Sequence, residues 1–209
     1  MSNSNYYFFF KYALDFSFAF FLLIILSPLM ILIAVLIKLK LGSPIFFIQE
    51  RPGLNQKLFK LIKFRSMNVT SHLNDGALGD KDRLTKFGCF LRSSSIDEIP
   101  SLVNVLMGHM SLVGPRPLLP EYLQLYSKAQ AKRHKVRPGI TGWAQVNGRN
   151  SISWNDKFDL DLWYVNNQSL FIDFKILFIT IKQVLKREGI NNNADLTMEK
   201  FKGNKVEKS

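Results

Sequence analysis

The strongest pattern in the chain is a long apolar segment near its N-terminus. Residues 16–37, FSFAFFLLIILSPLMILIAVLI, carry no charge, and as a helix they would extend about 33 Å, enough to cross the hydrocarbon core of a bilayer. A cleaved signal peptide has a shorter apolar region and a cleavage site of small residues, and we see neither. The pattern therefore predicts a membrane helix over residues 1–40.

Ser27-Pro28 interrupts this segment in its middle. Proline cannot donate to the carbonyl four residues earlier and its ring crowds the preceding turn, so a kink is expected, while a serine hydroxyl can bond a freed carbonyl. Each half of the segment is about one leaflet long. The helix could cross the membrane with a kink, or enter and leave on the same side.

Beyond residues 38–43 the pattern becomes that of a globular domain. Apolar runs at 45–48 and 58–64, on either side of Arg51-Pro52-Gly53, predict two short strands. Three further segments have helical patterns: 99–106, 120–136 and 170–187. Turn residues predict irregular structure in three others: 70–82, 113–120 and 137–150. This pattern indicates an α+β, mostly helical domain with short strands.

The segment 170–187 combines apolar residues with lysines on one helical face, Lys175, Lys182 and Lys186. Such a helix is suited to a membrane interface. A core helix with a solvated lysine edge has the same pattern, so the sequence alone leaves both interpretations open.

Charge and cysteine usage narrow the environment. The formal net charge of +12 indicates an anionic partner, either nucleic acid or the cytoplasmic face of a membrane. The apolar segment favours membrane lipids and no nucleic acid. Residues 38–65 hold seven basic residues against one acid, which places that side in the cytoplasm. Cys89 is the single cysteine, so no internal disulfide forms and a reducing compartment fits.

Candidate chemistry begins with Asp97 and Glu98 in SSSIDEIPSL, residues 93–102. Ser95 and Glu98 have the spacing of a capping box, but Pro100 is tolerated best near the start of a helix. We therefore predict Asp97 as the N-cap, with Glu98 beginning the helix. A carboxylate that receives backbone N–H groups stays ionised, which suits a cap, a metal ligand or a nucleophile. On its own, such a stretch is more often only a helix start.

Phosphate-binding glycine loops are missing, so arginines would have to hold any phosphate. Arg116 lies between two prolines, which fix the backbone around a planar bidentate donor. Arg137 precedes Pro138-Gly139. The other candidates are Arg92 and Arg149, and each arginine could equally be a surface residue at a turn. Further acids occur at Asp161 and Asp173. Trp143 and Trp154 could stack on a base or a sugar, although buried tryptophans more often belong to a core.

Four long stretches occur in a fixed order: QERPG…FKLIKFRSM, DRLTKFGCFLRSSSIDEIPSLVNVLMGHMSLVGPRPL, HKVRPGITGWAQVNGR and FDLDLWYVNNQSLFIDFKIL. Together they closely resemble the bacterial sugar transferase family, the monotopic phosphoglycosyl transferases, over roughly residues 8–190. The chain resembles the small members, which consist of a catalytic domain and one N-terminal membrane segment.

The resemblance implies transfer of a sugar-1-phosphate from a UDP-sugar to polyprenyl (undecaprenyl) phosphate. The reaction would take place at the cytoplasmic face of the bacterial inner membrane, as the first membrane step of cell-surface glycan or glycoprotein glycan assembly. Downstream glycosyltransferases would be further partners. We expect three parts: a re-entrant membrane helix over 1–40, a cytoplasmic catalytic domain with interfacial amphipathic helices over 41–190, and a flexible tail over 191–209.

The same resemblance assigns roles to individual residues. Asp97 matches a nucleophile that forms a covalent phosphosugar, with Mg²⁺ bound at Asp97 and Glu98. Ser27-Pro28 matches the break that makes the membrane helix re-entrant. The arginines that match phosphate-holding positions are Arg92, Arg116 and Arg149, and Asp161 and Asp173 match acids of the family pattern.

Four positions depart from that pattern: Cys89, Ile96, Ser101 and His109. None of them is an acid of the pair, so they bear on sugar identity or packing. Two alternatives remain open. The two carboxylates could hold Mg²⁺ while polyprenyl phosphate attacks the nucleotide sugar directly, or the chain could be a membrane adaptor without chemistry. The intact acid pair and Pro-Arg-Pro argue against the adaptor.

Overall fold

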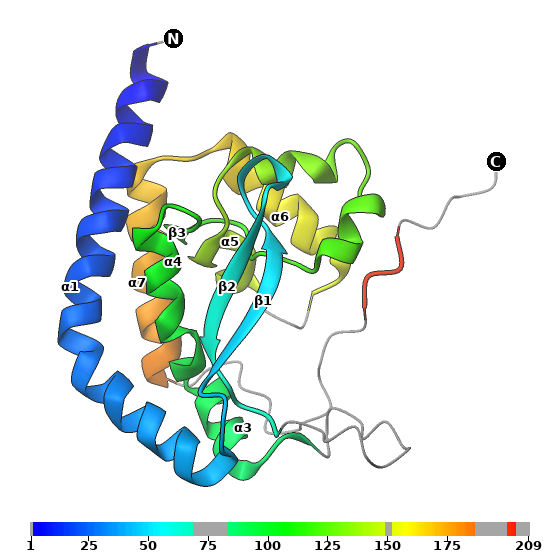
Figure 1. Cartoon of the computed structure of the whole chain (residues 1–209). Helices are drawn as coiled ribbons and strands as arrows, with labels where there is room; N and C mark the ends of the chain where they lie inside the picture. The colour runs from blue at the N-terminus through cyan, green and yellow to red at the C-terminus, as the bar shows by residue number, and fades with distance from the viewer. Residues whose placement is uncertain (1, 69–82, 149–151, 187–199, 204–209) are drawn as a thin grey trace.

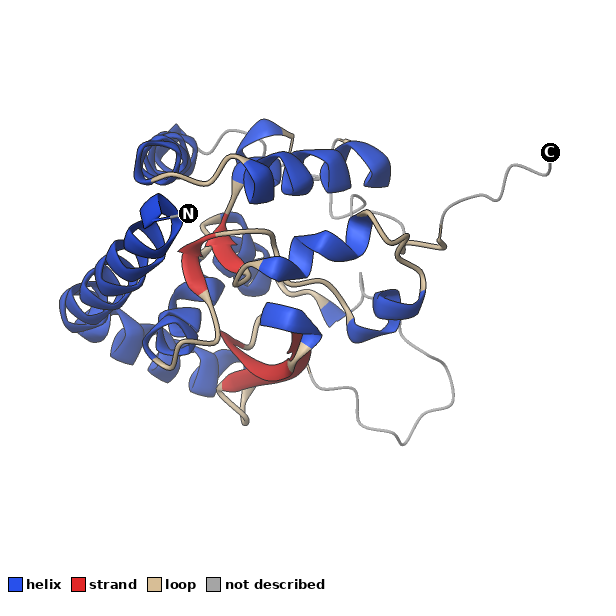
Figure 2. Ribbon diagram, turned by 90° about the horizontal axis from the view of Figure 1, so that it is seen from above, coloured by secondary structure: helices blue, strands red, loops and turns tan. Residues whose placement is uncertain are grey.

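The computed structural model describes residues 2–68, 83–148, 152–186 and 200–203. A long N-terminal helix lies along one side of a mostly helical domain that contains two small sheets (Figure 1). Figure 2 shows one sheet near the centre of the domain and the other at its edge. The predicted fold class, an α+β membrane-associated domain with short strands, is confirmed.

Helix α1, Ser2–Leu41, contains the whole apolar segment and continues through Pro28. Pro28 has no N–H to donate to the carbonyl of Ile24, and the hydroxyl of Ser27 donates to that carbonyl instead, at 2.8 Å. Figure 1 shows α1 bending about halfway along its length. Ser27 therefore compensates locally for the missing backbone bond, as its place beside the proline predicts.

One narrow side of α1 contacts the domain. Ala19, Ile33 and Ile37 are buried, whereas many large apolar side chains, Phe21 and Ile25 among them, remain exposed. Among the described residues, α1 is the one helix long and apolar enough to cross a membrane. Exposed apolar surface on this scale is stable next to lipid, and the protein is membrane-associated.

Polar contacts fix α1 against the far end of the chain. Asp173 accepts hydrogen bonds from Lys11 at 2.8 Å, Tyr7 at 3.0 Å and Tyr164 at 2.7 Å. Asp15 accepts from the backbone N–H of Leu112 at 3.2 Å. The N-terminal half of the helix is thus attached to the domain by buried charges.

The predicted strands form an antiparallel hairpin. Strand β1, Phe46–Pro52, pairs with β2, Leu58–Phe64, in the register Phe46↔Phe64 to Pro52↔Leu58. Arg65 donates to the carbonyls of Leu41, Gly42 and Ser43, which ties this end of the hairpin to the end of α1. The turn is a short 3-10 helix, Leu54–Gln56, at the opposite end.

The second sheet is parallel and was not expected. Strands β3, Ser111–Val113, and β4, Gly139–Thr141, pair side by side. A Cβ on Gly139 would lie 2.1 Å from the backbone nitrogen of Gly114, so the approach of the two chains needs glycine. The prediction of irregular structure over 137–150 is wrong here, and helix α5, Trp143–Asn147, follows β4. Strands this short carry no alternation to detect.

The remaining helices surround these sheets. They are α3, Lys86–Ser93; the 3-10 helix Ile96–Ser101; α4, Leu102–Leu106; the 3-10 helices Pro120–Gln124 and Gln130–Lys135; α6, Trp154–Asn166; and α7, Leu170–Lys186.

The prediction of one helix over 120–136 is wrong, because the chain turns between Ser127 and Gln130. The backbone N–H of Ser127 donates to the side chain of Gln130, and the N–H of Gln130 donates to the hydroxyl of Ser127. Such local side-chain bonds compete with a helical ladder.

Helix α7 and the C-terminal residues complete the packing. Asp173 and Ile176 face the core, while Phe171 and Phe178 are 78% and 71% exposed. The predicted loop at 70–82 lies outside the described residues, as does most of the expected tail. Residues 200–203 are described, and Phe201 is buried between Tyr122, Trp154 and Phe158. Of these four residues Phe201 is packed against the domain, whereas Lys200 and Lys202 are exposed.

Candidate active site

The acid pair lies in the first turn of the 3-10 helix Ile96–Ser101. Ser95 precedes it with φ 56°, a left-handed conformation, and makes no side-chain capping bond. The prediction that Asp97 is the N-cap is therefore wrong, and the alternative capping box does not form either. A capping residue is normally extended, which brings its side-chain oxygen to the free N–H groups; Ser95 instead turns the chain directly out of α3. Pro100 falls before the α-helical ladder of α4 begins.

Side chains of this 3-10 helix and of α4, which follows it, attach the segment to strand β2. Asn104 accepts from the backbone N–H of Ile62 at 3.0 Å and donates to the carbonyl of Lys60 at 2.8 Å. Ser101 donates to the carbonyl of Ile62 at 2.9 Å. The two side chains thus act like part of a neighbouring strand, and the departure at Ser101 has a structural role. This attachment places Lys63 beside the acid pair.

Glu98 is held by two cations. Its Oε1 accepts from Arg116 and from Lys63, both at 2.6 Å, and its Oε2 accepts from Arg116 at 3.4 Å. Burial alone would raise the pKa of Glu98, but the charges of Arg116 and Lys63 outweigh it and lower the pKa to about 2. Glu98 is ionised throughout the physiological range, and its oxygens are engaged.

Asp97 differs from Glu98 both in the bonding of its carboxylate and in the direction of its pKa shift. Its side chain is 9% exposed, and no described residue forms a hydrogen bond or ion pair with its carboxylate. Burial and the charge of Glu98 raise the pKa of Asp97 to about 6, against the opposing charges of Lys63, Arg116 and Arg92. Near pH 7 this carboxylate is mostly ionised and has oxygens to spare for a substrate or a metal ion.

The predicted arginines are placed differently from one another. Arg92, on α3, donates to Ser66 at 3.0 Å, and its charge acts on Asp97. Arg116 contacts Glu98 directly. Arg137 lies over the ring of Tyr12, 4.2 Å from its centre, and so contacts α1 rather than the acid pair. Arg149 lies outside the described residues.

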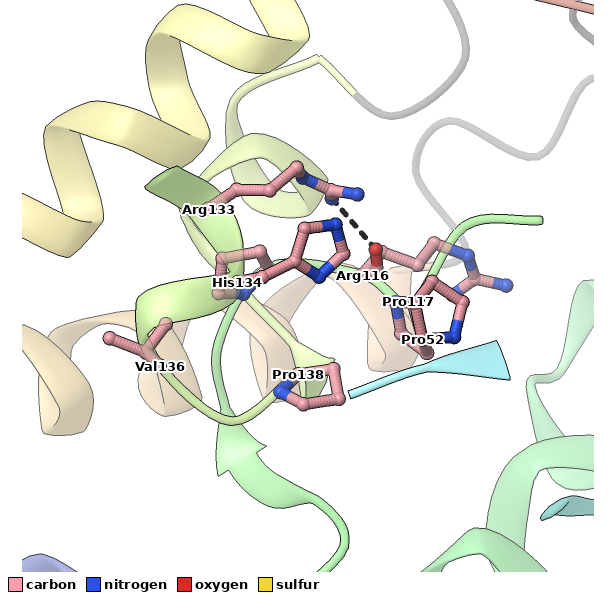
Figure 3. Close-up of a pocket in the computed structure, with 8 residues that line it drawn as sticks. Pro52, Arg116, Pro117, Arg133, His134, Val136 and Pro138 are labelled. Atoms are coloured by element: carbon pink, nitrogen blue, oxygen red, sulfur yellow. Dashed lines mark hydrogen bonds between the residues drawn. The ribbon is translucent and has the colours of Figure 1, made fainter. Parts of the chain in front are cut away.

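The two further acids form ion pairs within the protein. Asp161 is 2% exposed and accepts from Arg133 at 2.7 and 3.1 Å. Arg133 also donates to the backbone carbonyl of Arg116 at 2.8 Å, the dashed line in Figure 3. Asp161 therefore reaches the site through Arg133, and Asp173 joins α7 to α1. Neither contacts the acid pair.

The predicted tryptophans have protein neighbours. Trp143 stacks on Trp163 with ring centres 4.7 Å apart, and Trp154 packs against Phe158 and Phe201. Their rings contribute to packing in this structure.

Sequence reasoning missed Lys63 and Arg133, which both contact the site. A lysine within a short apolar strand, two residues from a buried arginine, was the available signal for Lys63. Arg133 belongs to the run Lys132-Arg133-His134-Lys135, and the pattern does not show which member is buried. Only the tertiary contacts identify these two residues.

The site could bind Mg²⁺ only together with ligands from a substrate. The described residues contain no group of three or more acidic, histidine or cysteine side chains that could hold a metal ion. Mg²⁺ commonly binds one or two carboxylates together with water and substrate phosphates. Because Glu98 is occupied by Arg116 and Lys63, Asp97 has the freer oxygens. Asp97 fits such a metal when a phosphate supplies further ligands, and Glu98 would join it only by sharing its oxygens with Arg116 and Lys63.

Comparison with known proteins places the chain. The sequence profile of the bacterial sugar transferases matches residues 6–187. The chain belongs to the bacterial sugar transferase family. The resemblance seen in the motifs is thereby confirmed, and so is the predicted enzyme class, a phosphoglycosyl transferase.

Individual relatives are similar over most of the chain. The uncharacterized sugar transferase EpsL of Bacillus subtilis is 54% identical over 177 residues, 85% of this chain and 88% of that protein. The UDP-glucose:undecaprenyl-phosphate glucose-1-phosphate transferase of Xanthomonas campestris is 40% identical over 198 residues, but this chain covers 40% of its length. A UDP-N-acetylgalactosamine-undecaprenyl-phosphate N-acetylgalactosaminephosphotransferase of Aeromonas hydrophila is 39% identical, and the chain covers 44% of it.

Proposed function

We propose that this protein transfers a sugar-1-phosphate from a UDP-sugar to undecaprenyl phosphate at the cytoplasmic face of the bacterial inner membrane. The relatives named for this reaction act on UDP-sugars and undecaprenyl phosphate. The single observation that carries the mechanism is the unequal acid pair: Glu98 is held by two cations and Asp97 is free. The product, a sugar linked to the lipid by a diphosphate, would begin cell-surface glycan or glycoprotein glycan assembly.

The reaction takes two steps at one phosphorus atom. A carboxylate oxygen of Asp97 attacks the phosphorus that bears the sugar, the bond to the bridging oxygen breaks, and that oxygen keeps the electron pair as uridine monophosphate leaves. An oxygen of undecaprenyl phosphate then attacks the aspartyl phosphosugar and restores the carboxylate. A buried but ionised carboxylate is suited to the first attack, because it is weakly solvated.

The neighbouring positively charged residues offset the negative charge of the substrate phosphates. Lys63 and Arg116 keep Glu98 ionised and in place, so Glu98 positions two cations beside the reacting phosphate instead of attacking it. Arg92 adds a third positive charge near Asp97. Mg²⁺, when bound at the carboxylates and the substrate phosphates, supplies charge that reduces repulsion between Asp97 and the diphosphate.

The membrane helix brings the site to its lipid substrate. We propose that α1 is re-entrant at Ser27-Pro28, with both ends cytoplasmic, and that the exposed apolar face of α7 lies in the same membrane interface. Seven basic residues in 38–65 suit the anionic cytoplasmic leaflet. In this arrangement the phosphate of a polyprenyl lipid would need no transfer through water to reach Asp97.

One set of experiments distinguishes an enzyme from an adaptor, and two-step transfer from direct transfer. Purified protein with Mg²⁺, a UDP-sugar and undecaprenyl phosphate should release uridine monophosphate, and a panel containing UDP-glucose and UDP-N-acetylgalactosamine identifies the sugar. An adaptor would release none with any donor. Without acceptor, sugar-phosphate label should stay on the protein through denaturation, at Asp97, and Asp97→Asn should carry no label. An active protein that is never labelled under conditions preserving acyl phosphates, with ternary-complex kinetics, would establish direct transfer.

A further inference from the structure

Arg51, at the distal end of strand β1, is a guanidinium without an acidic partner. Its Nη2 donates to the side chain of Gln49 at 2.6 Å, and its Nη1 donates to the carbonyl of Pro117 at 3.4 Å. Its Nε is buried and has no hydrogen-bond partner. No carboxylate of the described residues lies within 4 Å of it. Burial and the charge of Arg116 both lower the pKa of Arg51, which means that both disfavour its positive charge.

Arg51 lies next to the segment that carries Arg116. Pro117, which accepts from Arg51, is the residue after Arg116, and Pro52 lines a small pocket together with Arg116 and Pro117 (Figure 3). Arg116 is compensated by Glu98, whereas Arg51 is not. Of these two neighbouring guanidinium groups, only Arg116 is paired with a carboxylate of the described residues, which leaves an excess of positive charge that an anionic ligand would offset.

The position of Arg51 indicates which phosphate it would meet. Arg116 contacts Glu98 beside Asp97. Arg51 contacts Pro117, the residue that follows Arg116. Figure 1 shows the hairpin starting at the C-terminal end of α1 and turning at its opposite end. Arg51 pairs with Phe59 near that turn, five residues and about 17 Å from Phe46. The end of the hairpin that Arg65 ties to α1 suits the approach of a lipid phosphate, which leaves the end that carries Arg51 to the soluble substrate.

We propose that Arg51 binds the leaving phosphate of the donor, the one that departs with the nucleoside. This inference rests on the proposed function, since it assigns a phosphate of that reaction. As the bridging oxygen leaves with its electron pair, the departing monophosphate gains a negative charge. The free N–H groups of Arg51 would offset that charge, while Arg116 remains with the phosphate under attack.

The experiment uses full-length protein in detergent and three single variants. Arg51→Met removes the charge and the donors, Arg51→Lys keeps the charge and loses the planar fork, and Lys57→Met removes an exposed lysine from the same hairpin as a matched control. Initial rates are measured against the UDP-sugar and, separately, against undecaprenyl phosphate. Binding of uridine monophosphate is measured by calorimetry, which needs no turnover.

We expect Arg51→Met to lower kcat/KM for the UDP-sugar at least tenfold and to weaken uridine monophosphate binding at least tenfold. The KM for undecaprenyl phosphate should stay within twofold, Arg51→Lys should recover part of the loss, and Lys57→Met should behave as the wild type. A raised KM for the lipid with unchanged nucleotide binding would assign Arg51 to the acceptor and overturn the proposal. A loss of kcat alone, with both KM values and nucleotide binding unchanged, would make Arg51 a support of the Pro117 backbone and overturn it too.

The wild type provides the reference for the proposed function. Wild-type protein that releases uridine monophosphate, together with an Arg51→Met variant that binds it normally, would overturn the Arg51 assignment alone. Wild-type protein that neither releases nor binds uridine monophosphate would overturn the proposed function, and the assignment with it.

Discussion

Arg133 connects a buried acid to the backbone of Arg116: it donates twice to one carboxylate oxygen of Asp161 and once to the carbonyl of Arg116. Arg133 and Asp161 are each 2% exposed. A buried ion pair of this kind is weak as a source of stability but costly to break, because the remaining charge has no water. Asp161 therefore controls where the backbone of Arg116 lies.

Replacing Asp161 with leucine should destabilise the protein by about 3–5 kcal/mol, since Arg133 would keep a buried charge without a partner. The double variant Arg133→Met with Asp161→Leu should be less destabilised than the single one. Denaturant unfolding of detergent-solubilised protein measures both. Transferase activity should fall in both variants, because the carbonyl of Arg116 is disturbed. Lost activity at unchanged stability would instead indicate that Asp161 contacts substrate.

The pKa of Asp97, about 6, predicts how activity depends on pH. The carboxylate attacks only when ionised, so the rate of protein labelling without acceptor should fall as pH drops through about 6. Glu98→Gln removes the adjacent negative charge and should move this midpoint to lower pH. Rapid-quench labelling between pH 4.5 and 8 measures it. A midpoint that Glu98→Gln does not move would contradict the electrostatic account of the pair.

The same shift affects stability with a definite sign. The pKa of Asp97 is raised from 3.8 in folding, so between those values the folded state binds more protons than the unfolded one. Stability from this group therefore decreases as pH rises from about 4 to 6. Asp97→Asn should stabilise the protein by about 1–3 kcal/mol at pH 8 and by much less at pH 4. Urea unfolding at both values provides the comparison, and a variant no more stable at pH 8 would disprove it.

Arg116→Lys should lose most activity although the charge is kept. Arg116 donates to both oxygens of Glu98, and a lysine cannot reproduce that fork while also facing a phosphate. Because Lys63 still pairs with Glu98, stability should change little. Steady-state kinetics and thermal unfolding of the variant test both statements. A fully active lysine variant would show that Arg116 is needed only as a charge, or not at all.

Replacing Ser27-Pro28 with Ala-Leu should convert α1 from re-entrant to spanning. The change restores the backbone donor to the carbonyl of Ile24 and removes the ring that bends the helix. As a straight helix α1 is about 60 Å long, more than a bilayer requires. A single cysteine at position 3, in a chain with Cys89→Ser, reports the topology by labelling of spheroplasts. Periplasmic labelling before the replacement would rule out the re-entrant form.

Several elements follow from local pattern, and the failures have identifiable physical causes. The apolar run and the Ser27-Pro28 break predict α1 and its side-chain compensation. Apolar runs at 45–48 and 58–64, on either side of Arg51-Pro52-Gly53, predict the hairpin. The N-cap was misplaced because Ser95 adopts a left-handed conformation that sequence does not reveal. The strand Gly139–Thr141 was missed because it exists only through its contact with Ser111–Val113.

Some residues of the candidate site could be predicted from motifs, and others could not. Asp97, Glu98 and Arg116 are recognisable from motifs, because the acid pair and the arginine between two prolines both lie in a long stretch that resembles the family. Lys63 is recruited to Glu98 by the bonds of Asn104 and Ser101 to β2, a tertiary effect with no sequence signature. The difference between the two acids also depends on that recruitment. Motifs therefore locate the pair, and three-dimensional contacts assign the roles within it.

Phe201 extends the packed domain beyond the last of the sequence motifs. Its ring centre lies 5.1 Å from that of Phe158, and the guanidinium of Arg133 lies over the Phe158 ring, 5.7 Å from its centre. A protein shortened to residue 190, where the motifs stop, would lose this ring and leave an empty space against the residue that holds Arg116. A shortened protein that keeps this packing must therefore include Phe201.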